Sequence, residues 1–417
     1  MNQTEMSTES GNTPAARYER SMRAGRGNSL QIILKVAERC NIACTYCYFF
    51  FGGDDSHKFN PAFIGDDTVD DLAAFVEEAI ERYRLDLVRI IIHGGEPLML
   101  KRPRMERLLG AIAAASKATQ LQFTIQTNAM LVDEAWIELF ERFNVYVGVS
   151  IDGPREANDT YRLDKRSRGT YDRTIAGLEL LRKAHADGRI ARPGALCVVN
   201  PELVDAQVLY GHLVRDLEFH NVDFLLPDDN HDSMPEPRRA AFRSFMLELF
   251  ECYRAEKDGR VTIRFFNKLL YALTMKPFFA SELQRYFARK DIVFTVSSAG
   301  DIAPDDILRM TDPQLMKLGL NIRDATLADV LRNERLDELA DVTYRLPTAC
   351  GGCEWSSVCR GGDIYHRYRR GTGFDNPSIY CDTLKALFER MAETAVDSGM
   401  PVEAIDARLK TPLPVVA

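Results

Sequence analysis

The residues best suited to chemistry in this sequence are its cysteines, and three of them lie together in the stretch "RCNIACTYC". Three and then two residues separate Cys40, Cys44 and Cys47. Three thiolates from one loop can bind three irons of a [4Fe–4S] cluster, which leaves the fourth iron open to another ligand. The spacing alone leaves two alternatives, a zinc site closed by a remote His and a set of buried thiols without a metal.

A second group of cysteines lies near the end of the chain. Cys350, Cys353 and Cys359 fall in "CGGCEWSSVCRGGD", and Cys381 follows. Four thiolates can bind every iron of a cluster, although a four-cysteine zinc site remains the main alternative. The total of nine cysteines is odd and no secretory signal is visible, so a disulfide framework is not expected.

These residues need a scaffold, and the sequence predicts alternating strands and helices from Leu30 onward. Repeated units of about 30 residues predict a parallel sheet with right-handed crossovers, in which chemistry gathers at the carboxyl ends of the strands. Strands are expected at residues 30–36, 87–95, 120–128, 145–153, 194–200 and 221–227. Helices are expected at residues 66–84, 103–117, 133–143, 171–188 and 205–218.

Residues with chemical potential do follow these strands. The sequence "HGGEP" ends the second strand, "SIDG" ends the fourth, and "LCVVN" lies in the fifth. Two glycines let the backbone approach a ligand closely, and an Arg such as Arg162 can bind a carboxylate through two hydrogen bonds. Each feature also has an ordinary interpretation: a tight turn, a helix cap at Ser150, a surface charge at Arg162, a core side chain at Leu196. Their order along the strands favours one shared site.

Composition limits the class of protein. The chain has 417 residues, 46% of them hydrophobic, and a net charge of -8, which argues against a surface for nucleic acids. No apolar stretch reaches the roughly 20 residues of a membrane span, so we expect a cytoplasmic protein that binds no membrane. Residues 1–28 are polar and are expected to form a disordered segment before the fold.

The first cysteine motif, with Tyr46 before its last cysteine, resembles that of the radical S-adenosylmethionine (SAM) family. The resemblance implies a partial (β/α)6 barrel over residues 29–235 and SAM bound at the open iron. Its reductive cleavage would yield a 5'-deoxyadenosyl radical that abstracts hydrogen from C–H bonds. The SAM contacts implied are Tyr46 in the pocket wall, Gly94, Gly95 and Glu96 at the amino group, Ser150 and Arg162 at the ribose and carboxylate, and Leu196 at the adenine.

The later cysteines resemble the SPASM domain, in which Cys350, Cys353, Cys359 and Cys381 would hold an auxiliary [4Fe–4S] cluster. A full SPASM domain has further cysteines where this chain has Asp305 and Asp363, so we expect a single auxiliary cluster. The resemblance divides the rest of the chain into a helical bridge over residues 236–295, a SPASM-like domain over 296–387, and a C-terminal helix and tail over 388–417.

A narrower resemblance rests on "GDIAPDDILRM" and "GGDIYHRYRRGTGFDNPSIYC". Both look like segments of maturases of ribosomally made peptides, in the branch that forms cyclophane (triceptide-type) crosslinks. This implies a precursor peptide as substrate, a bond between an aromatic ring and a nearby Cβ, and an electron donor such as flavodoxin or ferredoxin. Asp306 matches a carboxylate that serves as a base in related enzymes, so we expect it to accept a proton; helix capping is the alternative.

Two other functions remain open. One keeps the radical chemistry but changes the product to an epimer, a different crosslink or formylglycine, and the absent cysteines count against formylglycine. The other is a zinc-bound scaffold without SAM chemistry. Iron content and absorbance near 400 nm would separate the scaffold from the enzyme.

Overall fold

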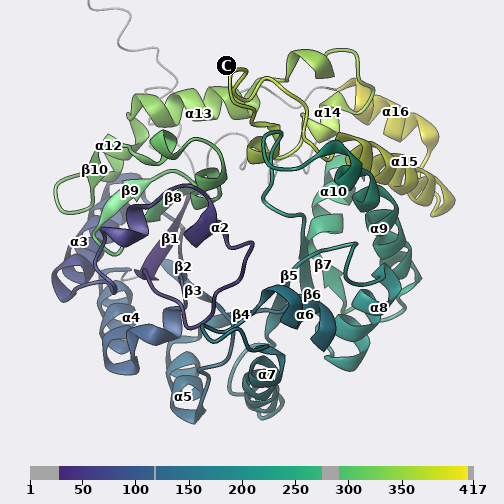
Figure 1. Cartoon of the computed structure of the whole chain (residues 1–417). Helices are drawn as coiled ribbons and strands as arrows, with labels where there is room; N and C mark the ends of the chain where they lie inside the picture. Colours follow the sequence, from purple (N-terminus) through teal and green to yellow (C-terminus); the bar gives the residue numbers. More distant parts are fainter. Residues whose placement is uncertain (1–27, 117–118, 275–290, 412–417) are drawn as a thin grey trace, which may run out of the picture.

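A computed structural model describes residues 28–116, 119–274 and 291–411, which form one curved sheet with helices on its outer face (Figure 1). Its strands run in the order β10-β9-β8-β1-β2-β3-β4-β5-β6-β7. The predicted disordered segment, apart from Asn28, lies outside the described residues. The strands are β1 Ser29–Ala37, β2 Leu87–Gly94, β3 Gln120–Thr127, β4 Tyr146–Ser150, β5 Gly194–Val198, β6 Asn221–Leu225, β7 Thr262–Ile263, β8 Asp291–Val296, β9 Asp301–Ala303 and β10 Leu320–Asn321.

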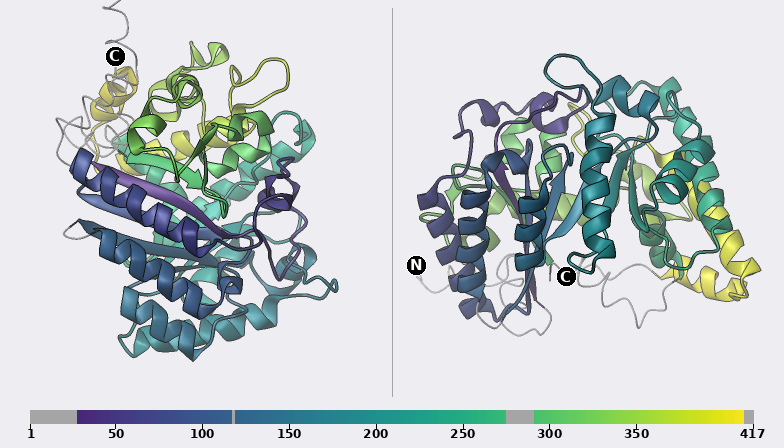
Figure 2. Two further views of the ribbon diagram at one scale, coloured as in Figure 1. Left: turned by 90° about the vertical axis from the view of Figure 1, so that its left-hand side faces the viewer. Right: turned by 90° about the horizontal axis from the view of Figure 1, so that it is seen from below.

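The six strands predicted from the sequence are confirmed, and β1 to β6 pair in parallel in chain order. This is the predicted α/β class with a partial barrel. The covering helices lie outside the curve and run along the strands, as two further views show (Figure 2). The main ones are α3 Asp66–Tyr83, α4 Arg102–Ser116, α5 Glu134–Phe143, α7 Tyr171–Ala186, α8 Ala206–Tyr210 and α9 Glu236–Ala255.

Helix α3 illustrates why these segments cover the sheet. Asp66 and Asp67 lie in its first turn, where the helix dipole favours negative charge. Its apolar side chains recur on one face, and those of Leu72 and Val76 are fully buried in the main core. The same pattern of an apolar face against the strands makes each strand–helix unit bury its own part of the core.

The strands present two different faces. Along β2, Ile90 and Ile92 are buried under the helices, whereas Ile91 and His93 alternate with them and are partly exposed on the concave side. Lys35 of β1 pairs in register with His93, so it shares that inner face. Side chains at the carboxyl ends of the strands therefore point into the concavity that the helices leave open.

The C-terminal part of the chain extends the same sheet. Strand β8 pairs in parallel with β1, β9 pairs antiparallel with β8, and β10 pairs antiparallel with β9. The segment predicted as a helical bridge contains α9 and α10 (Arg264–Thr274), together with β7 and β8. Among the described residues, no helix has both the length and the apolar character needed to cross a bilayer. Smaller elements used below are α2 Tyr48–Phe51, η4 Asp306–Met310, α14 Ser356–Cys359 and α15 Cys381–Asp397.

Candidate active site

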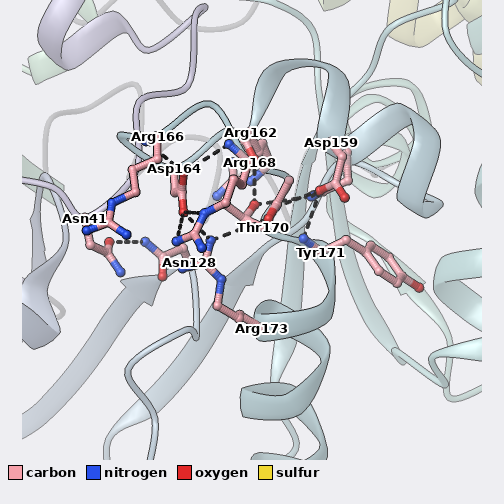
Figure 3. A network of polar contacts seen from close by, with 12 residues as sticks. Asn41, Asn128, Asp159, Arg162, Asp164, Arg166, Arg168, Thr170, Tyr171 and Arg173 are labelled. Atoms are coloured by element: carbon pink, nitrogen blue, oxygen red, sulfur yellow. Dashed lines mark hydrogen bonds and ion pairs between the residues drawn. The ribbon is translucent and has the colours of Figure 1, made fainter.

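The first cysteine loop follows β1 and is held by hydrogen bonds to two other loops. Ala43 N donates to Leu163 O at 2.7 Å, and Asn128, after β3, donates through Nδ2 to Asn41 Oδ1 at 2.8 Å. The segment around Leu163 is fixed by Asp164, whose carboxylate accepts hydrogen bonds from the arginines beside it (Figure 3). These contacts fix the loop that carries the cysteines to the segments that follow β3 and β4.

The structure brings Cys40, Cys44 and Cys47 together. Burial raises the pKa of Cys40 to about 12 and also raises those of Cys44 and Cys47, and the three groups lie close enough for each ionised thiol to disfavour the next. Clustered buried thiols are stable as thiolates only beside compensating positive charge, which iron provides. Within the described residues, no three His, Cys, Asp or Glu side chains converge closely enough for a single metal ion. A cluster does not require such convergence, because each thiolate binds a different iron.

Gly94 and Gly95 bring the end of β2 against the cysteine loop. Gly94 has a φ of +132°, and a Cβ on Gly95 would lie only 2.2 Å from Arg39 O. Gly95 N donates to Ala37 O at 2.7 Å. Among the described residues, the close approach that the glycines permit is therefore to the backbone of β1 and the cysteine loop, and it fixes that loop relative to β2.

Glu96 has a buried carboxylate with three hydrogen-bond donors. Oε1 accepts from Thr127 Oγ1 at 2.7 Å and from Leu98 N at 3.1 Å, and Oε2 accepts from Asn128 N at 2.9 Å. A carboxylate can accept about four hydrogen bonds, which leaves room for one more donor at Oε2. Burial raises the pKa of Glu96, so a bound ammonium group would offset the cost of its charge.

Arg162 and Tyr46 meet above the end of β4. Arg162 is buried and donates through Nη1 to Tyr46 Oη at 2.9 Å, and Tyr46 in turn donates to Asp152. Arg162 Nε is buried and has no hydrogen-bond partner in the described part of the chain. An orphaned guanidinium donor is costly and fits an anionic ligand group such as a carboxylate. Asp152 was not singled out from the sequence, although it lies in the "SIDG" stretch.

Ser150 and Leu196 lie side by side on the concave face, where β4 pairs with β5. Ser150 Oγ accepts a hydrogen bond from Gln126 Nε2 at 2.7 Å, which leaves its own hydroxyl proton free to donate. Leu196 is only partly buried. The pair thus offers one polar and one apolar contact next to the Arg162 group, as a nucleoside would require.

Asp306 lies on the same concave face, and the structure contradicts its interpretation as a helix cap. Asp305 caps η4, because its side chain accepts from Ile307 N. Asp306 is buried and accepts hydrogen bonds from Lys35 Nζ and from Tyr48 Oη, the latter at 2.6 Å. Sequence analysis missed Lys35; the available signal was a lysine inside an apolar strand.

The four later cysteines also come together: Cys350 and Cys353 precede α14, Cys359 ends it, and Cys381 begins α15. Burial raises the pKa of Cys359 to about 12, with a further contribution from Cys381, Cys350 and Cys353. Four neighbouring thiols provide the donors of a closed cluster. The aspartates at the positions of the missing cysteines have other partners, since Asp363 pairs with Lys268 at 2.8 Å and Asp305 caps η4.

Known proteins align with this chain along most of its length. A serine-type anaerobic sulfatase-maturating enzyme of Bacteroides thetaiotaomicron is 25% identical over 362 residues, which cover 82% of this chain and 84% of that protein. A cysteine-type anaerobic sulfatase-maturating enzyme of Clostridium novyi is 23% identical over 381 residues, which cover 87% and 95%.

A solved structure, "Native anSMEcpe with bound AdoMet and Kp18Cys peptide", superposes with a TM-score of 0.71 at 21% identity over 88% of this chain and 99% of that one. It shows the fold. Residues 34–201 match the model of the Radical SAM superfamily, and they include the first cysteine loop, the glycine pair, Ser150, Arg162 and Leu196. The part of the chain that is similar to the Radical SAM superfamily is therefore the part that carries the first cysteine loop and the residues around it.

Proposed function

We propose that this protein is a radical SAM enzyme that oxidises a side chain of a peptide substrate. The observation that carries the proposal is the meeting, on one concave face, of a three-thiol loop and a buried carboxylate, Asp306, held by Lys35 and Tyr48. The comparisons favour formylglycine formation at a Cys or Ser as the outcome, because the relatives named above are sulfatase-maturating enzymes that align along most of the chain.

The described residues suit the cofactors of this chemistry. Cys40, Cys44 and Cys47 would hold a [4Fe–4S] cluster, at which bound SAM supplies a 5'-deoxyadenosyl radical that removes a hydrogen atom from the substrate. Glu96 Oε2 would accept from the SAM amino group, and the orphaned Arg162 Nε would bind its carboxylate. Tyr46, Gly94, Gly95, Ser150 and Leu196 would complete the SAM pocket.

Asp306 would accept the proton that the oxidised substrate must lose. Conversion of a Ser side chain to an aldehyde removes two hydrogens, one as an atom and one as a proton with an accompanying electron. Cys350, Cys353, Cys359 and Cys381 would hold the auxiliary [4Fe–4S] cluster, which can carry an electron. The carboxylate has an ammonium beside it that favours its ionised, proton-accepting form.

A second candidate is a cyclophane crosslink in a precursor peptide. Asp305 and Asp363 favour this candidate, because they stand where a full SPASM domain has further cysteines, and the absence of those cysteines counts against formylglycine formation. Both side chains have other partners, Ile307 N for Asp305 and Lys268 for Asp363. Such a crosslink also removes two hydrogens and also requires a proton acceptor when the aromatic ring is restored. Asp306 would serve in either reaction.

The test is anaerobic turnover of the iron-loaded protein with SAM and a reductant, dithionite or a flavodoxin or ferredoxin system. One substrate is a sulfatase-type peptide offered in Ser and Cys forms, and the other is an aromatic-rich precursor peptide encoded beside the gene. From the Ser peptide, a product two hydrogens lighter that reacts with a hydrazide is an aldehyde. From the Cys peptide, loss of two hydrogens gives a thioaldehyde, which water converts to the same aldehyde as sulfide leaves. A product two hydrogens lighter that does not react with a hydrazide is a crosslink. Unchanged mass with an altered stereocentre indicates epimerisation, and a protein that binds zinc without iron would contradict the proposal.

A further inference from the structure

Lys35 is a fully buried ammonium group surrounded by three hydrogen-bond acceptors. Its Nζ contacts the Asp306 carboxylate, His93 Nδ1 at 3.1 Å and Tyr48 Oη at 3.3 Å. An ammonium has three N–H donors, so the three acceptors match its full capacity. Because His93 Nδ1 accepts, its ring proton must lie on Nε2, and burial with Lys35 lowers the pKa of His93 to about 3, which keeps the ring neutral.

The donors around Asp306 distinguish its two oxygens. Lys35 Nζ and Tyr48 Oη both donate to Oδ2. Among residues 28–116, 119–274 and 291–411, both side-chain hydrogen bonds that Asp306 accepts end on Oδ2. The carboxylate is thus anchored through one oxygen while the other remains open to accept a proton.

We propose that Lys35, Tyr48 and His93 form a positioning clamp that holds Asp306 ionised through Oδ2 and presents Oδ1 to the substrate. This inference rests on the proposed role of Asp306 as proton acceptor. The clamp joins three elements, since Lys35 lies on β1, Tyr48 on α2 and His93 on β2, whereas Asp306 opens η4. The open oxygen is consequently fixed by the same strand and loop that carry the first cysteine motif.

The clamp has a definite electrostatic consequence. Burial acts to raise the pKa of Asp306, and Lys35, together with His93 and Tyr48, outweighs it and holds the pKa below the ordinary value. A base that must be ionised loses activity as the pH falls through its pKa. Without Lys35 the largest of the contributions that oppose burial is lost, so the acid limb of the pH profile moves to higher pH. The charged and titratable groups that act on Asp306 are Lys35, Tyr48, His93, Asp228 and Asp305, and Glu38 and Arg309 act on Lys35.

The decisive variant is Lys35→Met, which keeps the length of the side chain and removes its charge. The matched control is Gln31→Met, on the same face of the same strand, where the side chain contacts Arg89 rather than the clamp. Each iron-loaded protein is assayed anaerobically from pH 6 to 9 for two products, 5'-deoxyadenosine and modified peptide. Thermal unfolding checks that each variant is folded.

We expect Lys35→Met to retain 5'-deoxyadenosine formation, to lose at least about tenfold in modified peptide per 5'-deoxyadenosine near pH 7, and to move the acid limb upward by about one pH unit or more. Tyr48→Phe, which removes one donor to Oδ2, should act in the same direction to a smaller extent. Gln31→Met should leave both the amount of modified peptide per 5'-deoxyadenosine and the pH profile unchanged.

The clamp would be overturned if Lys35→Met left both the amount of modified peptide per 5'-deoxyadenosine and the pH profile unchanged. It would also be overturned if both products fell in parallel while the acid limb of the pH profile stayed in place. Should Lys35→Met fail to fold, Tyr48→Phe decides by the same two readings. Asp306→Asn separates the two claims. Full product from Asp306→Asn removes Asp306 from the reaction and with it the base assignment, whereas an inactive Asp306→Asn beside a normal Lys35→Met removes the clamp alone.

Discussion

Replacement of Arg162 by Gln should weaken SAM binding without unfolding the protein. Arg162 is 6% exposed, and its Nε is a buried donor without a partner in the described residues. Each hydrogen bond from a charged group contributes roughly 1.5–3 kcal/mol, and roughly 1.4 kcal/mol corresponds to a tenfold change in Kd. Loss of the Arg162 contact should therefore raise the Kd for SAM by about 10- to 100-fold.

The assay is an anaerobic calorimetric titration of SAM into the iron-loaded protein. Arg168→Gln is the matched control, because Arg168 lies in the same loop and pairs with Asp164, yet its side chain is 62% exposed. Exposed ion pairs contribute at most about 1 kcal/mol, so this control should keep its stability and its affinity for SAM. Arg162→Lys keeps the charge without the planar fork and should fall between the two.

The refuting result is specific. If Arg162→Gln binds SAM as tightly as the unmodified protein while remaining folded, the orphaned Nε does not bind the carboxylate. If Arg168→Gln weakens SAM binding as much as Arg162→Gln, the effect comes from the loop as a whole, and the assignment to one guanidinium is wrong.

Three further predictions concern other parts of the site. Gly95→Ala should destabilise the protein and reduce iron uptake at the first cysteine motif, because the new Cβ would meet Arg39 O. Its control is Gly110→Ala on α4, where a Cβ has open space. This control should be neutral or should stabilise the protein by about 0.5–1 kcal/mol in thermal unfolding. Cys381→Ser should lower the iron content by up to about four atoms per chain while SAM binding persists, measured by iron analysis and titration. Burial and nearby carboxylates raise the pKa of Asp228 to about 7, so the stability that this group contributes below pH 4 is lost as the pH rises to 7. Asp228→Asn should therefore stabilise the protein more at pH 8 than at pH 5. Equal effects of the substitution at the two pH values in urea unfolding would contradict this prediction.

The sequence was sufficient for the parallel part of the fold because its signals are local. Each strand from β1 to β6 is a short apolar run, and each following helix has one apolar face, so neighbouring residues determine both. The placement of β8 beside β1 is different in kind. It pairs residues more than 250 positions apart, and no local pattern selects that edge of the sheet.

The same contrast between local signals and long-range contacts separates the site residues that the sequence predicts from those that it does not. The cysteine spacings and the residues at the strand ends are visible in single stretches of sequence. The sequence around Lys35 indicates only a buried strand, because its partner Asp306 lies 271 positions away and comes within reach only when η4 folds over the inner face. Helix capping at Asp306 was a reasonable local interpretation, but the neighbouring Asp305 occupies the cap. Charge pairs formed by tertiary contacts are thus the part of the site that local patterns miss.

The most direct test of the account is a single anaerobic turnover experiment with the iron-loaded protein, SAM, a reductant and the two peptide classes. The account predicts formation of 5'-deoxyadenosine together with a peptide product that has lost two hydrogens from a Ser-containing or aromatic-rich substrate. Iron bound to the protein with no SAM cleavage in the presence of either peptide would contradict it.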